Sequence, residues 1–70
     1  MENRELIGEI ERFLHTLSRD DRIIFMGRYW LFAPVAEIAQ RMGCTQSRVK
    51  TSLCRSRQKL QEHLKKEGLL

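Results

Sequence analysis

The 70-residue sequence is poor in proline, glycine and cysteine, and each of these low counts limits the classes of protein to which it can belong. It contains one proline and four glycines, which is too few for a flexible or proline-rich linker. Its two cysteines, Cys44 and Cys54, are ten positions apart and form no C-x-x-C pair. No secretory signal and no long apolar run precedes them, so we expect reduced thiols in a cytoplasmic protein with no membrane contact.

Residue patterns that carry catalysis or metal binding are also missing. The two cysteines together with His15 or His63 match no familiar ligand spacing of a structural zinc site. The sequence has no recognisable nucleophile, pair of acids or glycine-rich phosphate loop. We therefore expect no enzyme activity, no cofactor and no metal. His15 is expected to pack beside Phe13 and Leu14, and His63 to lie on a polar stretch without a chemical role.

Helical periodicity is the main signal that the sequence does contain. Apolar residues recur at steps of three and four along residues 3–16, which predicts an amphipathic helix. The polar side chains of this helix are expected to face outward: Glu5, Glu9, Glu11 and Arg12. Ser18 followed by Asp21 resembles a capping box, so a second helix is expected over residues 19–29.

Two further helices follow from local signals in the second half. Pro34 favours the start of a helix over residues 35–42, and Thr45 favours the start of another over residues 46–66. Ile38, Ala39 and Met42 share one stripe of the third helix, and the residue after it is a glycine that is free to take a positive φ. Residues 35–61 therefore have the pattern of a helix-turn-helix.

Together these segments predict one all-α domain over residues 1–70, in which the last three helices form a trihelical unit without a wing. The first helix is expected to pack across that unit. Ile23 and Met26 are expected to be buried, and Tyr29, Trp30 and Phe32 to pack in the core or the connector. The expected core consists of Leu6, Ile10, Phe13, Leu17, Ile24, Phe25, Ile38, Ala39, Met42, Val49, Leu53 and Leu60.

The positive charge is concentrated in the helix-turn-helix half. Residues 1–35 contain five Lys/Arg and six Asp/Glu, for a net charge of −1, whereas residues 36–70 contain eight and three, for a net charge of +5. Between positions 46 and 59 there are five basic residues and no acid. An exposed helix with this charge fits a polyanion, and an α-helix fits the major groove of B-form DNA.

A rotation of about 100° per residue indicates which side chains of the last helix face that groove. Val49 and Leu53 mark its inward side, so the opposite side is exposed. Residues near the start of such a helix reach base edges most easily. The expected base-reading residues are Gln46, Ser47, Lys50, Thr51 and Cys54. The expected phosphate contacts are Arg48, Arg55, Arg57 and Lys59.

Five short motifs lie between about residue 17 and residue 64. They are Arg22-Ile23-Ile24-Phe25, Arg28-Tyr29, Glu37-Ile38-Ala39 with Gly43, Val49-Lys50, and Leu53-x-Arg55-x-Arg57-x-x-Leu60. Singly these motifs are weak, but together they are moderately specific. Through them the sequence resembles region 4 of bacterial sigma factors of the sigma-70 family, most closely the compact extracytoplasmic-function type.

The resemblance implies binding of double-stranded promoter DNA at the −35 element and docking to the β flap of the RNA polymerase core. It also implies that an anti-sigma factor can cover either surface. Nothing in the sequence resembles a domain that melts the −10 element, so we interpret the chain as an excised domain of a longer sigma factor.

Two other functions are also compatible with the residues. The first is the DNA-binding domain of a dimeric response regulator or repressor, which would need a dimer surface and repeated half-sites. The second is a protein-interaction module, in which the connector of Trp30, Leu31 and Phe32 would form an exposed apolar patch.

Overall fold

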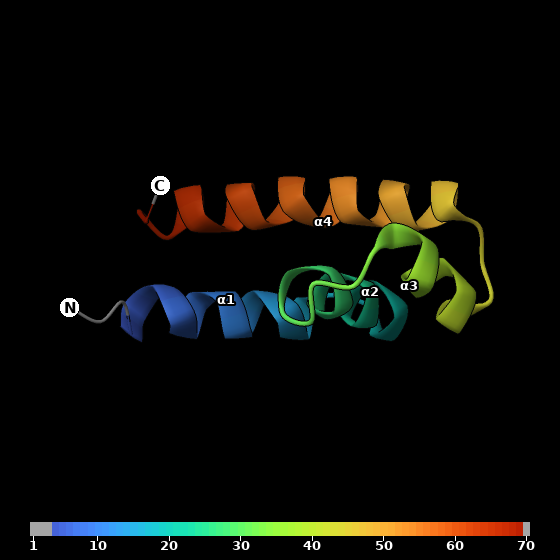
Figure 1. Ribbon diagram of the computed structural model, residues 1–70. Helices are drawn as coiled ribbons and strands as arrows, with labels where there is room; N and C mark the ends of the chain where they lie inside the picture. The colour runs from blue at the N-terminus through green and yellow to red at the C-terminus, as the bar shows by residue number, and fades with distance from the viewer. Residues whose placement is uncertain (1–3, 70) are drawn as a thin grey trace.

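The computed structural model describes residues 4–69, and within them it is entirely helical. The helices are α1 (Arg4–Thr16), α2 (Arg19–Tyr29), α3 (Val35–Met42) and α4 (Gln46–Lys66). Figure 1 shows α4 running the length of the molecule, with α1 antiparallel to it and α2 and α3 packed beneath its first half. The all-α prediction is confirmed. Residue 3, where the first helix was expected to start, lies outside the described residues.

The helix ends lie where local sequence signals place them. The Ser18 hydroxyl accepts a hydrogen bond from the Asp21 backbone N–H at the start of α2, at 3.2 Å. The Thr45 hydroxyl accepts one from the Arg48 N–H at the start of α4, at 3.1 Å. Gly43 ends α3 in the left-handed conformation, with φ 68°. These caps satisfy backbone groups that the helix itself leaves unpaired, and they fix the turn between α3 and α4.

Two apolar clusters form the core, and α4 contacts both. Ile24 from α2, Ile38 and Ala39 from α3, and Val49 and Leu53 from α4 form the cluster beneath the start of α4. The other cluster lies toward α1 and consists of Phe13, Leu14, Leu17 and Phe25, with Ile10 and Leu60 packed against it. Most of the expected core is therefore confirmed. Four expected members are only partly buried: Leu6, Ile10, Met42 and Leu60.

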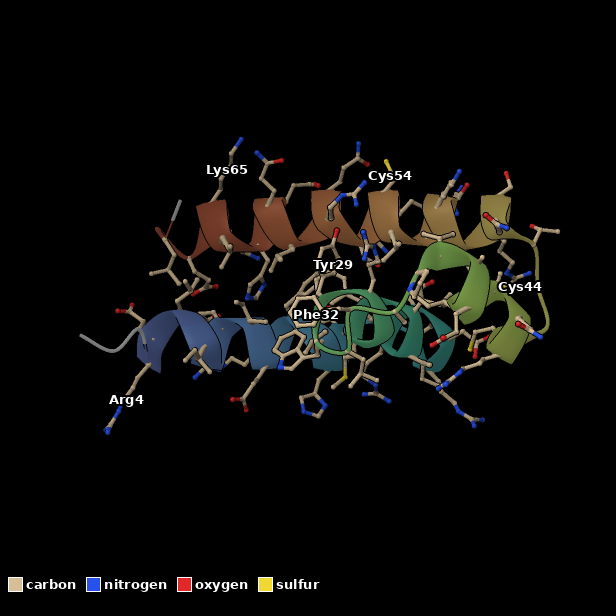
Figure 2. All side chains as sticks on the ribbon, in the orientation of Figure 1. Arg4, Tyr29, Phe32, Cys44, Cys54 and Lys65 are labelled. Atoms are coloured by element: carbon tan, nitrogen blue, oxygen red, sulfur yellow. The ribbon has the colours of Figure 1, made fainter. Side chains whose placement is uncertain are left out.

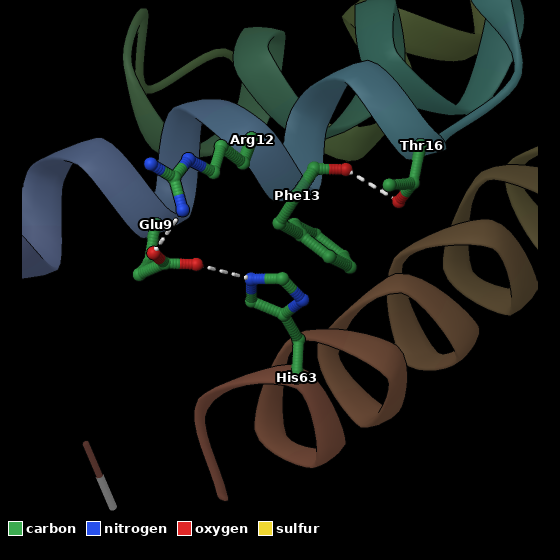
Figure 3. A network of polar contacts seen from close by, with 5 residues as sticks. All are labelled: Glu9, Arg12, Phe13, Thr16 and His63. Carbon is green, nitrogen blue, oxygen red and sulfur yellow. Dashed lines mark hydrogen bonds and ion pairs between the residues drawn. The ribbon is translucent and has the colours of Figure 1, made fainter. Parts of the chain in front are cut away.

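A buried carboxylate joins α1 to α4, where the sequence predicted an outward-facing side chain. Glu9 is 9% exposed, and its Oε1 lies 2.9 Å from His63 Nε2 while its Oε2 accepts a hydrogen bond from Arg12 Nη1 at 2.8 Å. Figure 3 shows this network beside the Phe13 ring. The prediction for Glu9 was wrong because its partner His63 lies on a distant helix, where periodicity within α1 gives no sign of it.

Other side chains that the sequence assigned to the interior are exposed. His15 does not pack into the core, and Ile23 and Met26 are 42% and 39% exposed. The side of α2 that carries Ile24 and Phe25 faces α4, which leaves these two apolar residues on the opposite side of the helix. The predicted burial of Ile23 and Met26 is therefore wrong.

The connector between α2 and α3 presents its apolar side chains to solvent. Trp30 is 52% exposed, Leu31 74% and Phe32 78%, and Tyr29 at the end of α2 is 38% exposed. For Trp30 and Phe32 the predicted packing in the core or connector is therefore wrong, whereas the Tyr29 ring does pack on Phe25, with a centroid distance of 4.8 Å. Backbone hydrogen bonds hold the segment against α2, from Leu31 N–H to the Met26 carbonyl and from Ala33 N–H to the Gly27 carbonyl. Phe32 also has a positive φ of 55°, a conformation that costs a bulky residue free energy.

Candidate nucleic-acid interface

The side of α4 that faces away from the other helices is the candidate interface. Val49 is completely buried, and Ser52, Leu53 and Ser56 are buried with it, so these residues define the inward side of the helix. Figure 2 shows Cys54 and Lys65 projecting from the opposite side into open space. The N-terminal half of this exposed side is free to approach a partner, because α3 and its turn lie below it.

Small side chains occupy the middle of the exposed side. Ser47, Thr51 and Cys54 are all exposed, and at about 100° per residue they lie within roughly 40° of the direction opposite Val49. Short side chains allow a helix to sit deep in the major groove, where base edges offer hydrogen-bonding groups and thymine methyl groups. The geometry is therefore suited to base contacts by this strip.

Cationic side chains flank the strip on both sides. Arg48, Arg55 and Lys59 lie along one edge of α4, and Lys50 and Arg57 lie along the other, about 140–180° away around the helix. All five are exposed. The two phosphate backbones border the major groove, so a helix lying in it with cations on both edges can contact either backbone. Gln46, the first residue of the helix, is exposed on the same edge as Lys50.

The electrostatics of α4 are strongly positive. The helix contains seven Lys/Arg and a single acid, Glu62, which lies four turns from its start. Its first turn contains no acid, although carboxylates are the side chains that commonly neutralise the positive end of the helix dipole. The helix dipole and the cationic side chains therefore both contribute to a positive potential where the strip of small side chains begins.

A polar groove of about 610 Å³ runs beside one edge of the strip, between the starts of α2 and α4. Arg48 and Arg55 line it on one side, and the acids Asp20 and Asp21 line it on the other. The Ser52 hydroxyl donates a hydrogen bond to Asp21 Oδ1 at 2.6 Å, which fixes α2 against α4. Asp21 therefore helps to hold α4 in position, and both acids border the basic edge of the helix.

Sequence reasoning missed one residue of the interface, Tyr29. Its hydroxyl accepts a hydrogen bond from Arg57 Nη1 at 2.8 Å, so the predicted phosphate ligand Arg57 is held by α2. This hydrogen bond is the largest cause that raises the pKa of Arg57 above its ordinary value. The only sequence signal was a tyrosine at the end of a helix, and nothing in it indicates which residue that tyrosine contacts.

A second surface lies away from α4, between α2 and α3. It is an apolar groove of about 520 Å³ whose walls include Ile23 and Met26 of α2, Leu31 of the connector and Met42 of α3. The exposed ion pair between Glu37 and Arg41, at 3.5 Å, lies on its α3 side. Ile23 and Met26, which the sequence assigned to the interior, thus line an open surface instead.

A short, capped turn between two packed helices, with an exposed basic second helix, defines a helix-turn-helix DNA-binding domain. The chain belongs to the sigma-70 region 4 family, since the family model described as "Sigma-70, region 4" matches residues 7–60. No curated protein and no solved structure matches the chain. Region 4 is a domain of sigma factors that binds promoter DNA and interacts with RNA polymerase, and the family is not an enzymatic one.

Two other kinds of feature are absent from residues 4–69. No three His, Cys, Asp or Glu side chains lie close enough together there to hold a metal ion, and both cysteines are free thiols. None of the four helices combines the length and the apolar composition needed to cross a bilayer.

Proposed function

We propose that this domain reads the −35 element of promoter DNA and so directs RNA polymerase to the start of transcription. The observation that supports this most strongly is the exposed side of α4, where a strip of small side chains runs between two cationic edges. The proposed base readers are Gln46, Ser47, Lys50, Thr51 and Cys54. The proposed phosphate contacts are Arg48, Arg55, Arg57 and Lys59. The helix-turn-helix unit is residues 35–61 within a single domain, and the cytoplasm is its proposed compartment.

A competition assay with two duplexes tests whether the domain distinguishes DNA sequences. The chain is expected to prefer a duplex carrying a −35 element over a scrambled duplex of equal length and composition. Lys50→Ala is expected to lower that preference by about 1–3 kcal/mol, the usual value of one base contact. Lys65→Ala is the matched control, because Lys65 is an exposed lysine of the same helix that lies five turns from its start. Equal loss of preference in both variants would contradict the assignment.

We further propose that the β flap of RNA polymerase docks in the apolar groove between α2 and α3. The groove and the exposed connector offer apolar surface on a side of the molecule that α4 leaves free. A partner bound there would therefore not block the side of α4 that enters DNA. An anti-sigma factor is proposed to act by covering one of these two surfaces.

The substitution Phe32→Gly tests binding to the β flap without lowering the stability of the fold. The variant is expected to fold at least as stably as the wild type, because glycine accepts the positive φ that strains phenylalanine and little burial is lost. It is expected to lose binding to the isolated β flap by about 2 kcal/mol, as an aromatic anchor does. Calorimetry and thermal unfolding measure the two effects.

The matched control for docking is Ile7→Ala, which removes an exposed apolar side chain of α1 outside the groove. It is expected to bind the flap as the wild type does. Unchanged flap binding by Phe32→Gly would remove the connector from the proposed surface.

The family match favours the sigma-type function over that of a dimeric response regulator or repressor. Sedimentation of the chain with a single-site duplex separates the two, because the proposed function requires one domain per duplex. A two-to-one complex on repeated half-sites would instead support the repressor.

A further inference from the structure

A hydrogen bond between side chains ties the end of α2 to the exposed part of α4. Arg57 Nη1 donates to the Tyr29 hydroxyl at 2.8 Å, across 28 positions of sequence. The Tyr29 ring packs on the buried Phe25 ring, with the centroids 4.8 Å apart, so the tyrosine is held by the core. Figure 2 shows Tyr29 reaching from α2 toward α4. The hydroxyl is therefore a fixed acceptor beside a flexible cationic side chain.

With α4 in the major groove, as the proposed function requires, Arg57 would lie at the edge of the helix that borders a phosphate backbone. It lies about 20° from Lys50 around α4 and seven residues further along, and is therefore more distant from the start of the helix, where base edges are reached most easily. A guanidinium has five N–H donors, and the tyrosine occupies only one of them. The remaining donors leave room for a two-pronged contact with phosphate oxygens.

We propose that Tyr29 is a positioning residue for DNA binding, whose hydroxyl holds the Arg57 guanidinium at the edge of α4 ready to contact a backbone phosphate. The inference rests on the proposed function, because it requires α4 to lie in the major groove. A free arginine loses side-chain freedom when it binds a phosphate, whereas one that is already held loses less. The hydroxyl thus strengthens binding without touching DNA or reading a base.

Tyr29→Phe tests the inference, because it removes the hydroxyl and keeps the ring that packs on Phe25. Affinity for a −35 duplex and for a scrambled duplex is expected to fall by the same factor, about threefold, with the ratio between them unchanged. Thr16→Val is the matched control. It removes a hydroxyl that donates a hydrogen bond to the Phe13 carbonyl within α1, and it is expected to leave DNA affinity unchanged.

A double-mutant cycle with Arg57→Ala distinguishes positioning from a general structural effect. If Tyr29 acts through Arg57, Tyr29→Phe has no further effect on affinity once Arg57 is alanine. The slope of log affinity against log salt is expected to be shallower by about 0.9 in Arg57→Ala, the value of one phosphate contact. Thermal unfolding of each variant confirms that the comparison is made between folded proteins.

Three results would overturn the inference. The first is unchanged affinity of Tyr29→Phe, and the second is tighter binding, which would mean that the tyrosine keeps Arg57 away from DNA. The third is an equal loss in the presence and absence of Arg57, which would mean that Tyr29 acts on the fold alone. If the wild-type chain bound no duplex at all, the proposed function itself would fail, and the inference with it.

Discussion

Binding of the chain to a −35 duplex is expected to weaken about 150-fold when the salt concentration rises from about 50 to about 200 mM. The estimate follows from the four proposed phosphate contacts, Arg48, Arg55, Arg57 and Lys59. Each contact displaces condensed counterions and adds about −0.9 to the slope of log affinity against log salt, for a total of about −3.6. Fluorescence anisotropy of a labelled duplex over a series of salt concentrations measures the slope.

Arg55→Ala provides the internal check on this expectation. Its slope is expected to be shallower by about 0.9, with equal weakening toward −35 and scrambled duplexes, because a phosphate contact carries no sequence information. Arg4→Ala is the control, since Arg4 begins α1 at a distance from the exposed side of α4. A slope near zero for the wild type, or one that Arg4→Ala reduces as much as Arg55→Ala does, would contradict the proposed phosphate contacts.

Phe13→Ala is expected to lower the free energy of unfolding by about 3–5 kcal/mol, the cost of deleting a buried phenyl ring. Phe13 is 2% exposed, and its ring centroid lies 6.0 Å from those of both Phe25 and His63. The ring thus joins α1 to α2 and α4 in a chain of 70 residues. A domain of this size has a small free energy of unfolding, so the variant is expected to be largely unfolded at 37 °C.

Chemical denaturation followed by circular dichroism measures the effect. Ile7→Ala on the same helix is the matched control, because Ile7 is 54% exposed and its truncation is expected to cost less than about 1 kcal/mol. If the two substitutions destabilised the protein equally, Phe13 would not have the central place in the core that the structure assigns to it.

The helix boundaries were predictable because short-range interactions determine them. Ser18 and Thr45 cap the helices that follow them, and Gly43 ends α3 through a backbone conformation that glycine adopts readily. Each of these signals acts over three or four residues, so it can be recognised from the sequence alone. The inward positions of α4, such as Val49 and Leu53, follow from helical periodicity in the same way.

Long-range pairings are what the sequence did not reveal. Periodicity assigned Glu9 to the surface because it is charged, yet His63 and Arg12 both contact its carboxylate in a buried position. The bond between Arg57 and Tyr29 was missed for the same reason, since it joins two helices. Such pairs depend on how helices pack, which patterns within one helix do not encode.

Apolar character was a misleading guide to burial in the connector. Phe32 was expected to pack, but Phe32 and the neighbouring Leu31 lie in a segment that folds back on α2 through its own backbone hydrogen bonds. That path leaves their side chains more than 70% exposed. An exposed apolar cluster of this kind is typical of a surface that a partner covers.

Selection of binding sites from random duplex DNA tests the central proposal most directly. The wild-type chain is expected to enrich one short motif, and the double variant Lys50→Ala, Thr51→Ala is expected to bind with little enrichment while keeping its salt-dependent affinity for DNA. Such a result would assign sequence reading to the exposed strip of α4. Selection of the same motif by both proteins, or of no motif by the wild type, would contradict that assignment.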